Sequence, residues 1–205
     1  MYDHKKRLIL KTALRLFRLY GLRAVTMDDI AKDAGMSKKT LYTWFNDKNA
    51  MVDALYRSII SIVDHHLNKI QAEEKNVVIR YVRIIDLALS AGDFVTDKVM
   101  QELKKYNPTT WKKLQYFTEK KLVTAIAGCI EEGSTQQYFQ PIFNSNVMAM
   151  LCLSELDFLN EVQQKNIPAL SIAETRQQLT RHLLNGIATP AGKKQAEKYF
   201  SITQL

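Results

Sequence analysis

The sequence predicts an all-α protein, and three observations lead to that class. Glycine and proline are scarce, with 7 and 4 among 205 residues, and no run of alternating β-branched residues bounded by turn signals occurs. Apolar residues recur at helical spacing, first as a stripe formed by Ile9, Ala13, Leu16, Phe17 and Tyr20. The breaks between such segments are single glycines, prolines or short polar runs. We therefore expect helices almost throughout.

Composition places the chain among soluble globular proteins. Hydrophobic residues make up 46% and charged residues 24% of the sequence, the balance of a chain with a buried core. No apolar run reaches the roughly 18 to 20 residues of a membrane-spanning helix, and the basic N-terminus lacks a signal-peptide cleavage site. Two cysteines without a leader, Cys129 and Cys152, are typical of reduced thiols. We expect a cytoplasmic protein with no membrane partner.

The positive charge is concentrated at one end of the chain. Residues 1–48 hold 11 Lys and Arg against 5 Asp and Glu, a balance of +6, whereas residues 49–205 hold 18 against 16, a balance of +2. A basic first quarter on a nearly neutral remainder indicates that this end meets a polyanion.

The basic quarter contains short helices with clear start and stop signals. Gly21 is placed to end the first helix. Thr26, with Asp29 three residues later, is the signature of a second helix that extends to about residue 34. Gly35 then forms a turn, and Ser37 caps a third helix.

Longer helices follow. Asp47 is expected to cap a fourth helix from Lys48 to about Ile70, whose apolar face comprises Val52, Leu55, Ile59, Ile62 and His66. Further helices are predicted at about 74–91, 94–106, 108–132, 144–164 and 171–187, and the tail from Pro190 is short or frayed. The predicted domains are a three-helix helix-turn-helix domain at 1–47 and a helical domain at 48–205.

Two short helices joined by a glycine turn, after an amphipathic helix, make a helix-turn-helix. In that motif the second helix enters the major groove of DNA. Leu41 and Phe45, four residues apart, would anchor one face of that helix. Its other faces carry donors that reach phosphates and bases. The alternative is an ordinary helical hairpin with a solvated basic face.

Residues 13–55 closely resemble the DNA-binding domain of TetR-type transcriptional regulators. The matching positions are Ala13, Leu16, Phe17, Gly21, Thr26, Asp29, Ile30, Ala31, Ala34, Gly35, Ser37, Thr40, Leu41, Tyr42, Phe45 and Lys48. The resemblance covers about the first quarter of the chain. Beyond it, the match is limited to helical character, length and the stretch "LLNGIATPAGKK".

The resemblance implies a set of DNA-binding residues. Thr26, Tyr42 and Lys48 occupy usual phosphate contacts, and Lys38, Lys39 and Thr43 are candidates for base readout. The complete predicted set is Thr26, Ser37, Lys38, Lys39, Thr40, Tyr42, Thr43 and Lys48.

The sequence departs from the family pattern at two places. Many relatives carry a small residue where Lys39 stands, so Lys39 either reads a base or contacts a phosphate. Asn49 and Ala50 replace acidic residues that are frequent after the lysine of the fourth helix, which weakens the local helix cap.

In the resembling family the second domain binds a small-molecule effector and forms a homodimer through its last two long helices. Two apolar stripes suit such an interface: Val147, Leu151 and Phe158 form one, and Leu179, Leu183 and Ile187 form the other. The alternative is that both stripes face the chain's own core. Candidate effector contacts are the aromatic and thioether residues Phe94, Met100, Tyr106, Trp111 and Phe117, which are equally suited to plain core packing.

No catalytic or metal-binding signature appears. A nucleophile elbow, a phosphate-binding P-loop, H-E-x-x-H and paired C-x-x-C motifs are all missing, so no enzyme activity, cofactor or metal is predicted. His65 and His66 are adjacent, and their side chains diverge by about 100° on a helix, which does not suit one metal ion.

The sequence thus predicts a TetR-type regulator, most simply a ligand-responsive repressor that binds a palindromic operator in double-stranded DNA as a dimer. One alternative is a regulator of the same fold that activates or lacks an effector. Another is a helical protein-interaction module whose basic face binds an acidic partner.

Overall fold

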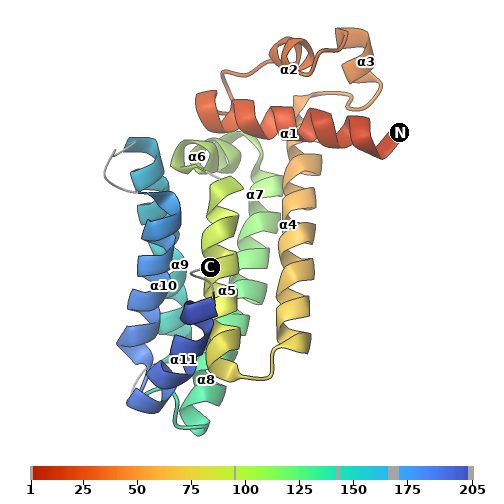
Figure 1. The fold of residues 1–205 in the computed structure, drawn as a ribbon. Coiled ribbons are helices and arrows are strands. Elements are labelled where there is room, and N and C mark those ends of the chain that lie inside the picture. Colours follow the sequence, from red (N-terminus) through yellow and green to blue (C-terminus); the bar gives the residue numbers. More distant parts are fainter. Residues whose placement is uncertain (1, 95, 142–143, 166–170, 203–205) are drawn as a thin grey trace. The chain divides into compact units, whose positions relative to one another are not determined.

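The computed structural model describes residues 2–94, 96–141, 144–165 and 171–202, and these residues form an all-α fold (Figure 1). Within these ranges, extended pairing is limited to one antiparallel bridge between Phe139 and Ala188. The predicted fold class is confirmed. No helix among the described residues is long and apolar enough to cross a membrane.

The chain divides into two compact units. Unit 1 comprises Met1–Ile62 and Phe94–Gln115, and unit 2 comprises Val63–Asp93 and Tyr116–Leu205. The predicted domains, 1–47 and 48–205, assign residues 94–115 to the second domain, whereas this segment packs here with the N-terminal helices. Helix α4(Lys48–Glu73) contributes to both units.

Unit 1 is built on the N-terminal helices. Besides its part of α4, its helices are α1(Tyr2–Tyr20), α2(Met27–Asp33), α3(Lys38–Tyr42), α6(Asp97–Tyr106) and most of α7(Pro108–Phe117). The predicted α1 stripe is buried from Ile9 to Phe17, but Tyr20 is exposed because the helix ends there. Gly21 has a left-handed φ of 87° and donates its N–H to the carbonyl of Phe17 at 2.8 Å, which closes α1.

Helix α4 continues from unit 1 into unit 2, and its buried face differs from the predicted one after Ile59. Asp47 caps it as predicted, since Asp47 Oδ1 accepts the N–H of Ala50 at 2.7 Å. Ile62 and His66, predicted to face inward, are exposed. The buried line instead continues from Ile59 in steps of four and three, through Val63, Leu67 and Ile70.

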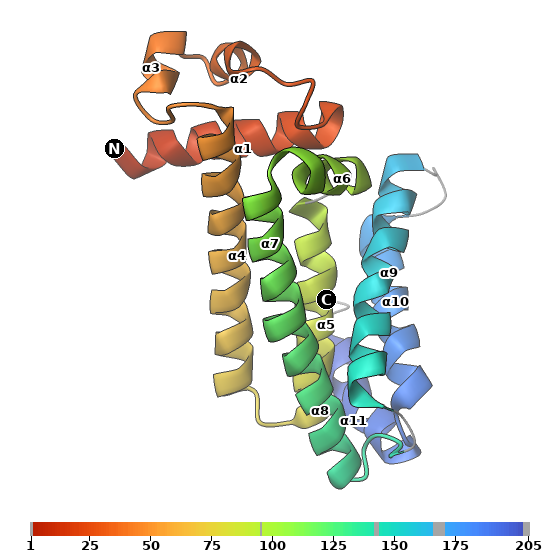
Figure 2. The same ribbon diagram turned by 180° about the vertical axis from the view of Figure 1, so that it is seen from behind.

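Unit 2 is a helical bundle around α5(Val77–Ala91). Its other elements are the end of α4, a π-helical turn η2(Thr118–Leu122), α8(Val123–Thr135), α9(Ser145–Lys165), α10(Ile172–Ile187) and α11(Pro190–Ile202), with a 3₁₀ turn η1(Gly92–Phe94) after α5. Helices α8, α9, α10 and α11 all contact α5, which both views of the ribbon show as the central element of the bundle (Figures 1 and 2). The predicted helix 108–132 is interrupted by the π-helical turn.

The core of unit 2 holds both cysteines. The Tyr81 hydroxyl lies 3.3 Å from Cys152 Sγ, and the Tyr81 ring meets Phe139 edge-on at 5.3 Å between centroids. Cys129 and Cys152 are free and buried, and burial raises the pKa of both thiols. This environment is that of inert, reduced thiols, as the sequence predicted.

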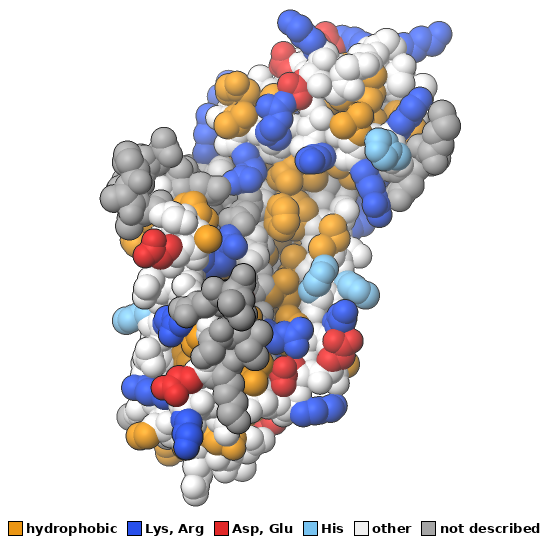
Figure 3. Space-filling model, in the orientation of Figure 1, with side chains coloured by type: hydrophobic (Ala, Val, Ile, Leu, Met, Phe, Trp, Pro, Cys, Tyr) orange, Lys and Arg blue, Asp and Glu red, His pale blue; other side chains and the backbone are white. Residues whose placement is uncertain are grey.

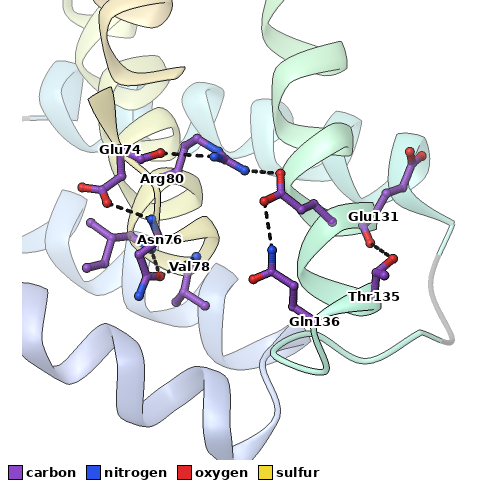
Figure 4. A network of polar contacts seen from close by, with 9 residues as sticks. Glu74, Asn76, Val78, Arg80, Glu131, Thr135 and Gln136 are labelled. Atoms are coloured by element: carbon purple, nitrogen blue, oxygen red, sulfur yellow. Dashed lines mark hydrogen bonds and ion pairs between the residues drawn. The ribbon is translucent and has the colours of Figure 1, made fainter. Parts of the chain in front are cut away.

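A polar network closes one end of the bundle (Figure 4). Arg80 donates to the carbonyl of Glu74 at 3.1 Å and pairs with Glu132, whose other oxygen accepts Gln136 Nε2 at 3.0 Å. Asn76 Oδ1 accepts the N–H of Val78 at 3.0 Å and so caps α5. The network therefore joins the α4–α5 turn to α8.

Candidate nucleic-acid interface

The N-terminus of α2 is held by a reciprocal capping box. The hydroxyl of Thr26 accepts the N–H of Asp29 at 3.2 Å, and Asp29 Oδ2 accepts both the N–H of Thr26 at 2.8 Å and its hydroxyl at 2.7 Å. These two donors of Thr26 lower the pKa of Asp29. The cap predicted from the sequence is confirmed. Because the single hydroxyl hydrogen of Thr26 is used on Asp29, Thr26 presents the helix end and does not itself offer a hydroxyl donor.

Helix α3 is fixed by a cap on one side and two buried anchors on the other. Ser37 Oγ accepts the N–H of Thr40 at 3.0 Å and lies 2.8 Å from the Thr40 hydroxyl. Leu41 and Phe45 are buried, as predicted. Gly35, with a left-handed φ of 65°, makes the turn between the two helices.

The remaining faces of α3 present polar side chains to solvent. Lys38, Lys39, Tyr42 and Thr43 are exposed, and Thr40 is half-buried. Tyr42 is 41% exposed, as a phosphate contact requires. Lys and Arg side chains are frequent on the surface of this unit (Figure 3). The structure therefore brings the predicted α3 residues together on one solvent-facing surface.

An ion pair links the first turns of the two helices. The Lys38 ammonium lies 2.8 Å from Oδ1 and 3.0 Å from Oδ2 of Asp28 in α2. The hydrogen bond to Asp28 raises the pKa of Lys38. Sequence reasoning assigned Lys38 to DNA but gave no role to Asp28, because an ion pair between two helices has no fixed sequence spacing.

Lys48 is placed differently from a phosphate contact. Its ammonium donates to the carbonyls of Leu22 and Val25, both at 2.9 Å, and lies 3.5 Å from that of Arg23. Carbonyls of the α1–α2 loop thus occupy the donors that the sequence assigned to DNA. In this arrangement Lys48 holds the loop that leads to Thr26.

Helix α6 also holds the α1–α2 loop. Lys98 Nζ donates to the carbonyl of Tyr20 at 2.8 Å, and Glu102 Oε2 accepts the N–H of Arg23 at 3.1 Å. A Cβ atom added at Gly21 would lie 2.6 Å from Lys98 Cε, so glycine leaves room for the Lys98 side chain beside the loop. Sequence reasoning missed Lys98 and Glu102, which lie more than seventy residues from the loop and belong to no motif.

The predicted dimer residues fall into two groups. Val147, Leu151 and Phe158 are exposed on α9, as an interface requires before a partner covers it. On α10, however, Leu183 is 7% and Ile187 0% exposed, because both pack into the chain's own core. The prediction is corrected for these two residues. Helical periodicity identified an apolar face, but the same chain buries that face. Leu179 is half-buried.

The predicted effector residues do not gather in one described cavity. Phe94, Met100, Tyr106 and Trp111 belong to unit 1, where Tyr106 is exposed, whereas Phe117 is buried in unit 2. Within unit 2, a cavity of about 490 Å³ lies elsewhere, among α5, α10 and α11. Its lining includes Asp86, Glu174, Arg176, Thr180, Tyr199 and Phe200.

Comparisons with known proteins agree with this arrangement. Residues 9–55 match the family model described as "Bacterial regulatory proteins, tetR family". The chain is 24% identical over 180 residues to the HTH-type transcriptional regulator YvaF of Bacillus subtilis (strain 168). The aligned residues cover 87% of this chain and 93% of YvaF.

Solved structures share the fold over nearly the whole chain. The ketosteroid transcriptional regulator KstR2 of Mycobacterium tuberculosis has a TM-score of 0.72 at 21% identity, covering 90% of this chain and 95% of KstR2. A putative transcriptional regulator from Saccharomonospora viridis, solved in complex with choline, has a TM-score of 0.74 at 21% identity, covering 91% of this chain and 99% of that one.

The all-α fold and the capped, solvent-facing α3 define a helix-turn-helix DNA-binding regulator of transcription. Within that class, the family match identifies residues 9–55 as a TetR-type DNA-binding segment, and the relative YvaF is likewise an HTH-type transcriptional regulator. The family predicted from the motif spacing is confirmed.

The position of Lys48 generates a testable prediction. Replacing Lys48 with Met leaves the carbonyls of Leu22 and Val25 without their ammonium partner, which should cost about 1–3 kcal/mol of unfolding free energy. DNA affinity should fall because the loop before Thr26 loses order, while the salt dependence of binding stays unchanged. Urea denaturation and binding titrations at several salt concentrations measure both effects.

Lys39→Met is the matched control, since Lys39 is exposed on α3. It should weaken DNA binding without lowering stability. A Lys48→Met protein that unfolds like the wild type, and whose binding depends less steeply on salt, would show instead that Lys48 contacts a phosphate.

Proposed function

We propose that the chain binds a palindromic operator as a homodimer, represses transcription in the cytoplasm, and releases DNA when a small molecule binds unit 2. The observation that carries the DNA-binding part is the geometry of α3. Its apolar face is anchored by Leu41, while Lys38, Lys39, Tyr42 and Thr43 face solvent. A helix held in this way is what insertion into a major groove requires.

The polar groups on this surface divide by chemistry. Lys38 and Lys39 carry ammonium donors that suit guanine O6 and N7, and the methyl group of Thr43 suits thymine. Ser37, Thr40 and Tyr42 offer neutral hydroxyls, which suit phosphate oxygens. Thr26 contributes indirectly, because its capping box with Asp29 fixes the N-terminus of α2 beside α3.

An exposed apolar face on α9 supports the dimer. Besides the three predicted residues, Met150 lies on this surface, and Val147 and Met150 are 61% and 64% exposed. Two half-sites of a palindrome lie one helical turn of DNA, about 34 Å, apart, and a twofold dimer matches that symmetry. The α9 face supplies apolar area for such an interface.

The cavity in unit 2 supports an effector site. Its volume of about 490 Å³ suits a small organic molecule. Asp86 is partly buried there, and its Oδ1 accepts the Thr180 hydroxyl at 3.3 Å; burial raises the pKa of Asp86. A carboxylate beside the ring of Tyr199 suits an organic ammonium group.

The DNA contacts predict separable mutant effects. Tyr42→Phe should weaken binding to operator and non-operator duplexes equally, by about 0.5–1.5 kcal/mol. The salt dependence of binding should not change, because a neutral hydroxyl displaces few counterions. Lys39→Ala should relax the preference at one base pair by about 1–3 kcal/mol. Binding to a library of single-base operator variants at two salt concentrations distinguishes these outcomes.

Lys193→Ala is the control, because Lys193 is exposed on α11 in unit 2. If Lys39→Ala lowers the affinity equally for every operator variant in the library, Lys39 contacts a phosphate and not a base. If neither α3 substitution alters DNA binding, the basic face meets a different partner, as in a helical protein-interaction module.

The dimer prediction is tested on α9. The protein should scatter light as a particle of about 47 kDa, twice its chain mass of 23.6 kDa. Leu151→Glu should yield monomers, because it places a charge in a desolvated interface, whereas Gln71→Glu, at an exposed position of α4, should not. A wild-type chain that is monomeric at micromolar concentration contradicts the proposal.

The effector prediction uses the unit 2 cavity. Choline and the small-molecule fraction of a bacterial lysate are suitable first probes. A bound effector should raise the stability by about 2.7 kcal/mol at a hundred times its Kd and weaken operator binding. Ala173→Trp, which narrows the cavity, should abolish the response while operator binding persists. If no probe changes operator binding, the regulator works without an effector.

A further inference from the structure

The ion pair between Asp28 and Lys38 joins the two short helices of the candidate interface. Asp28 belongs to the first turn of α2 and Lys38 is the first residue of α3. Both carboxylate oxygens lie within hydrogen-bond distance of the ammonium, at 2.8 and 3.0 Å. The two side chains remain 59% and 62% exposed, so DNA can reach the pair.

This pairing changes what Lys38 offers to DNA. A free lysine ammonium is a point charge on a flexible stem, which any phosphate attracts. Paired with Asp28, the ammonium favours one direction, and the carboxylate offsets part of its charge. A phosphate approaching Lys38 also approaches the negative charge of Asp28. The pair therefore weakens contacts that depend on charge alone.

A base edge makes different demands from a phosphate. Specific contacts in the major groove depend on donors placed in a defined direction, whereas non-specific affinity comes almost entirely from neutralised phosphates. An acidic partner that orients Lys38 and offsets its charge favours the first kind of contact over the second. Asp28 can thus raise selectivity without touching DNA.

We propose that Asp28 is a specificity-determining positioning residue, which acts through Lys38 to favour operator DNA over other DNA. This inference rests on the proposed DNA-binding function. An ordinary role for Asp28 also exists, because an acidic residue in the first turn of a helix stabilises it through the helix dipole. The two roles differ in their effects on salt dependence and base preference.

The test compares variants of the full-length chain on two probes. One probe is a duplex selected by the wild-type protein from a randomised pool, and the other is a shuffled duplex of the same composition. The variants are Asp28→Asn, which removes the charge, and Asp28→Glu, which keeps it. Asp33→Asn is the matched control, since Asp33 lies on the same helix and pairs with Arg15 instead.

Asp28→Asn is expected to bind the shuffled duplex more tightly, with a log–log salt slope steeper by about 0.9, because Lys38 becomes free to neutralise one more phosphate. The ratio of selected to shuffled affinity should fall about tenfold. Asp28→Glu should return the salt slope to the wild-type value. Asp33→Asn should leave the affinity ratio unchanged.

A double-mutant cycle establishes that Asp28 acts through Lys38. In a Lys38→Met background, Asp28→Asn should no longer change the affinity ratio. A thermal melt of each variant measures the helix-dipole role separately.

Three results overturn the proposal: an unchanged affinity ratio in Asp28→Asn, an equal change in Asp33→Asn, or an effect that persists in the Lys38→Met background. Failure of the wild-type chain to select any duplex would instead refute the proposed function.

Discussion

The two helices of the proposed DNA-binding surface are too short to be stable on their own. Helices α2 and α3 contain seven and five residues, far below the roughly 12 to 15 at which an isolated helix becomes stable in water. Each therefore exists only because its first N–H groups are satisfied by a side-chain cap and its apolar face is buried. Thr26 and Ser37 supply the caps, while Ile30 and Leu41 supply fully buried anchors.

The same constraint explains the bonds around the α1–α2 loop. A capping box orients a helix only if its own backbone is held, and the loop before Thr26 has no helical hydrogen bonds to hold it. Lys48 and Glu102 bond its backbone from α4 and α6. Within the same unit, Asn49 Oδ1 on α4 accepts Asn107 Nδ2 at 3.0 Å, next to the end of α6. The charged side chains of Lys48 and Glu102 thus replace secondary structure in ordering this loop.

Local features of the interface could be predicted from the sequence, because caps and turns depend on neighbouring residues. The capping box at Thr26, the cap at Ser37 and the turn at Gly35 are contained within segments of a few residues. Apolar periodicity identified Leu41 and Phe45 for the same reason. The all-α class followed from the spacing of apolar residues along whole helices.

Long-range features could not be predicted in this way. Periodicity shows that Leu183 and Ile187 share an apolar face but not whether the same chain or a partner covers it. The partners of Lys48 are loop carbonyls that carry no side-chain signal. On α4, Val63 is buried and Ile62 is exposed. Which of two adjacent apolar residues is buried depends on the helix that packs against them, and the sequence of α4 does not specify that helix.

Unit 1 is made of two separate chain segments, which matters for any attempt to exchange DNA specificity between relatives. Its chain is discontinuous, because residues 94–115 complete a body that begins at the N-terminus. A graft that transplants only the first 47 residues leaves behind Lys48, Lys98 and Glu102, which order the loop before α2. The proposed recognition surface therefore depends on two separated segments of sequence, and substitutions in one must stay compatible with the other.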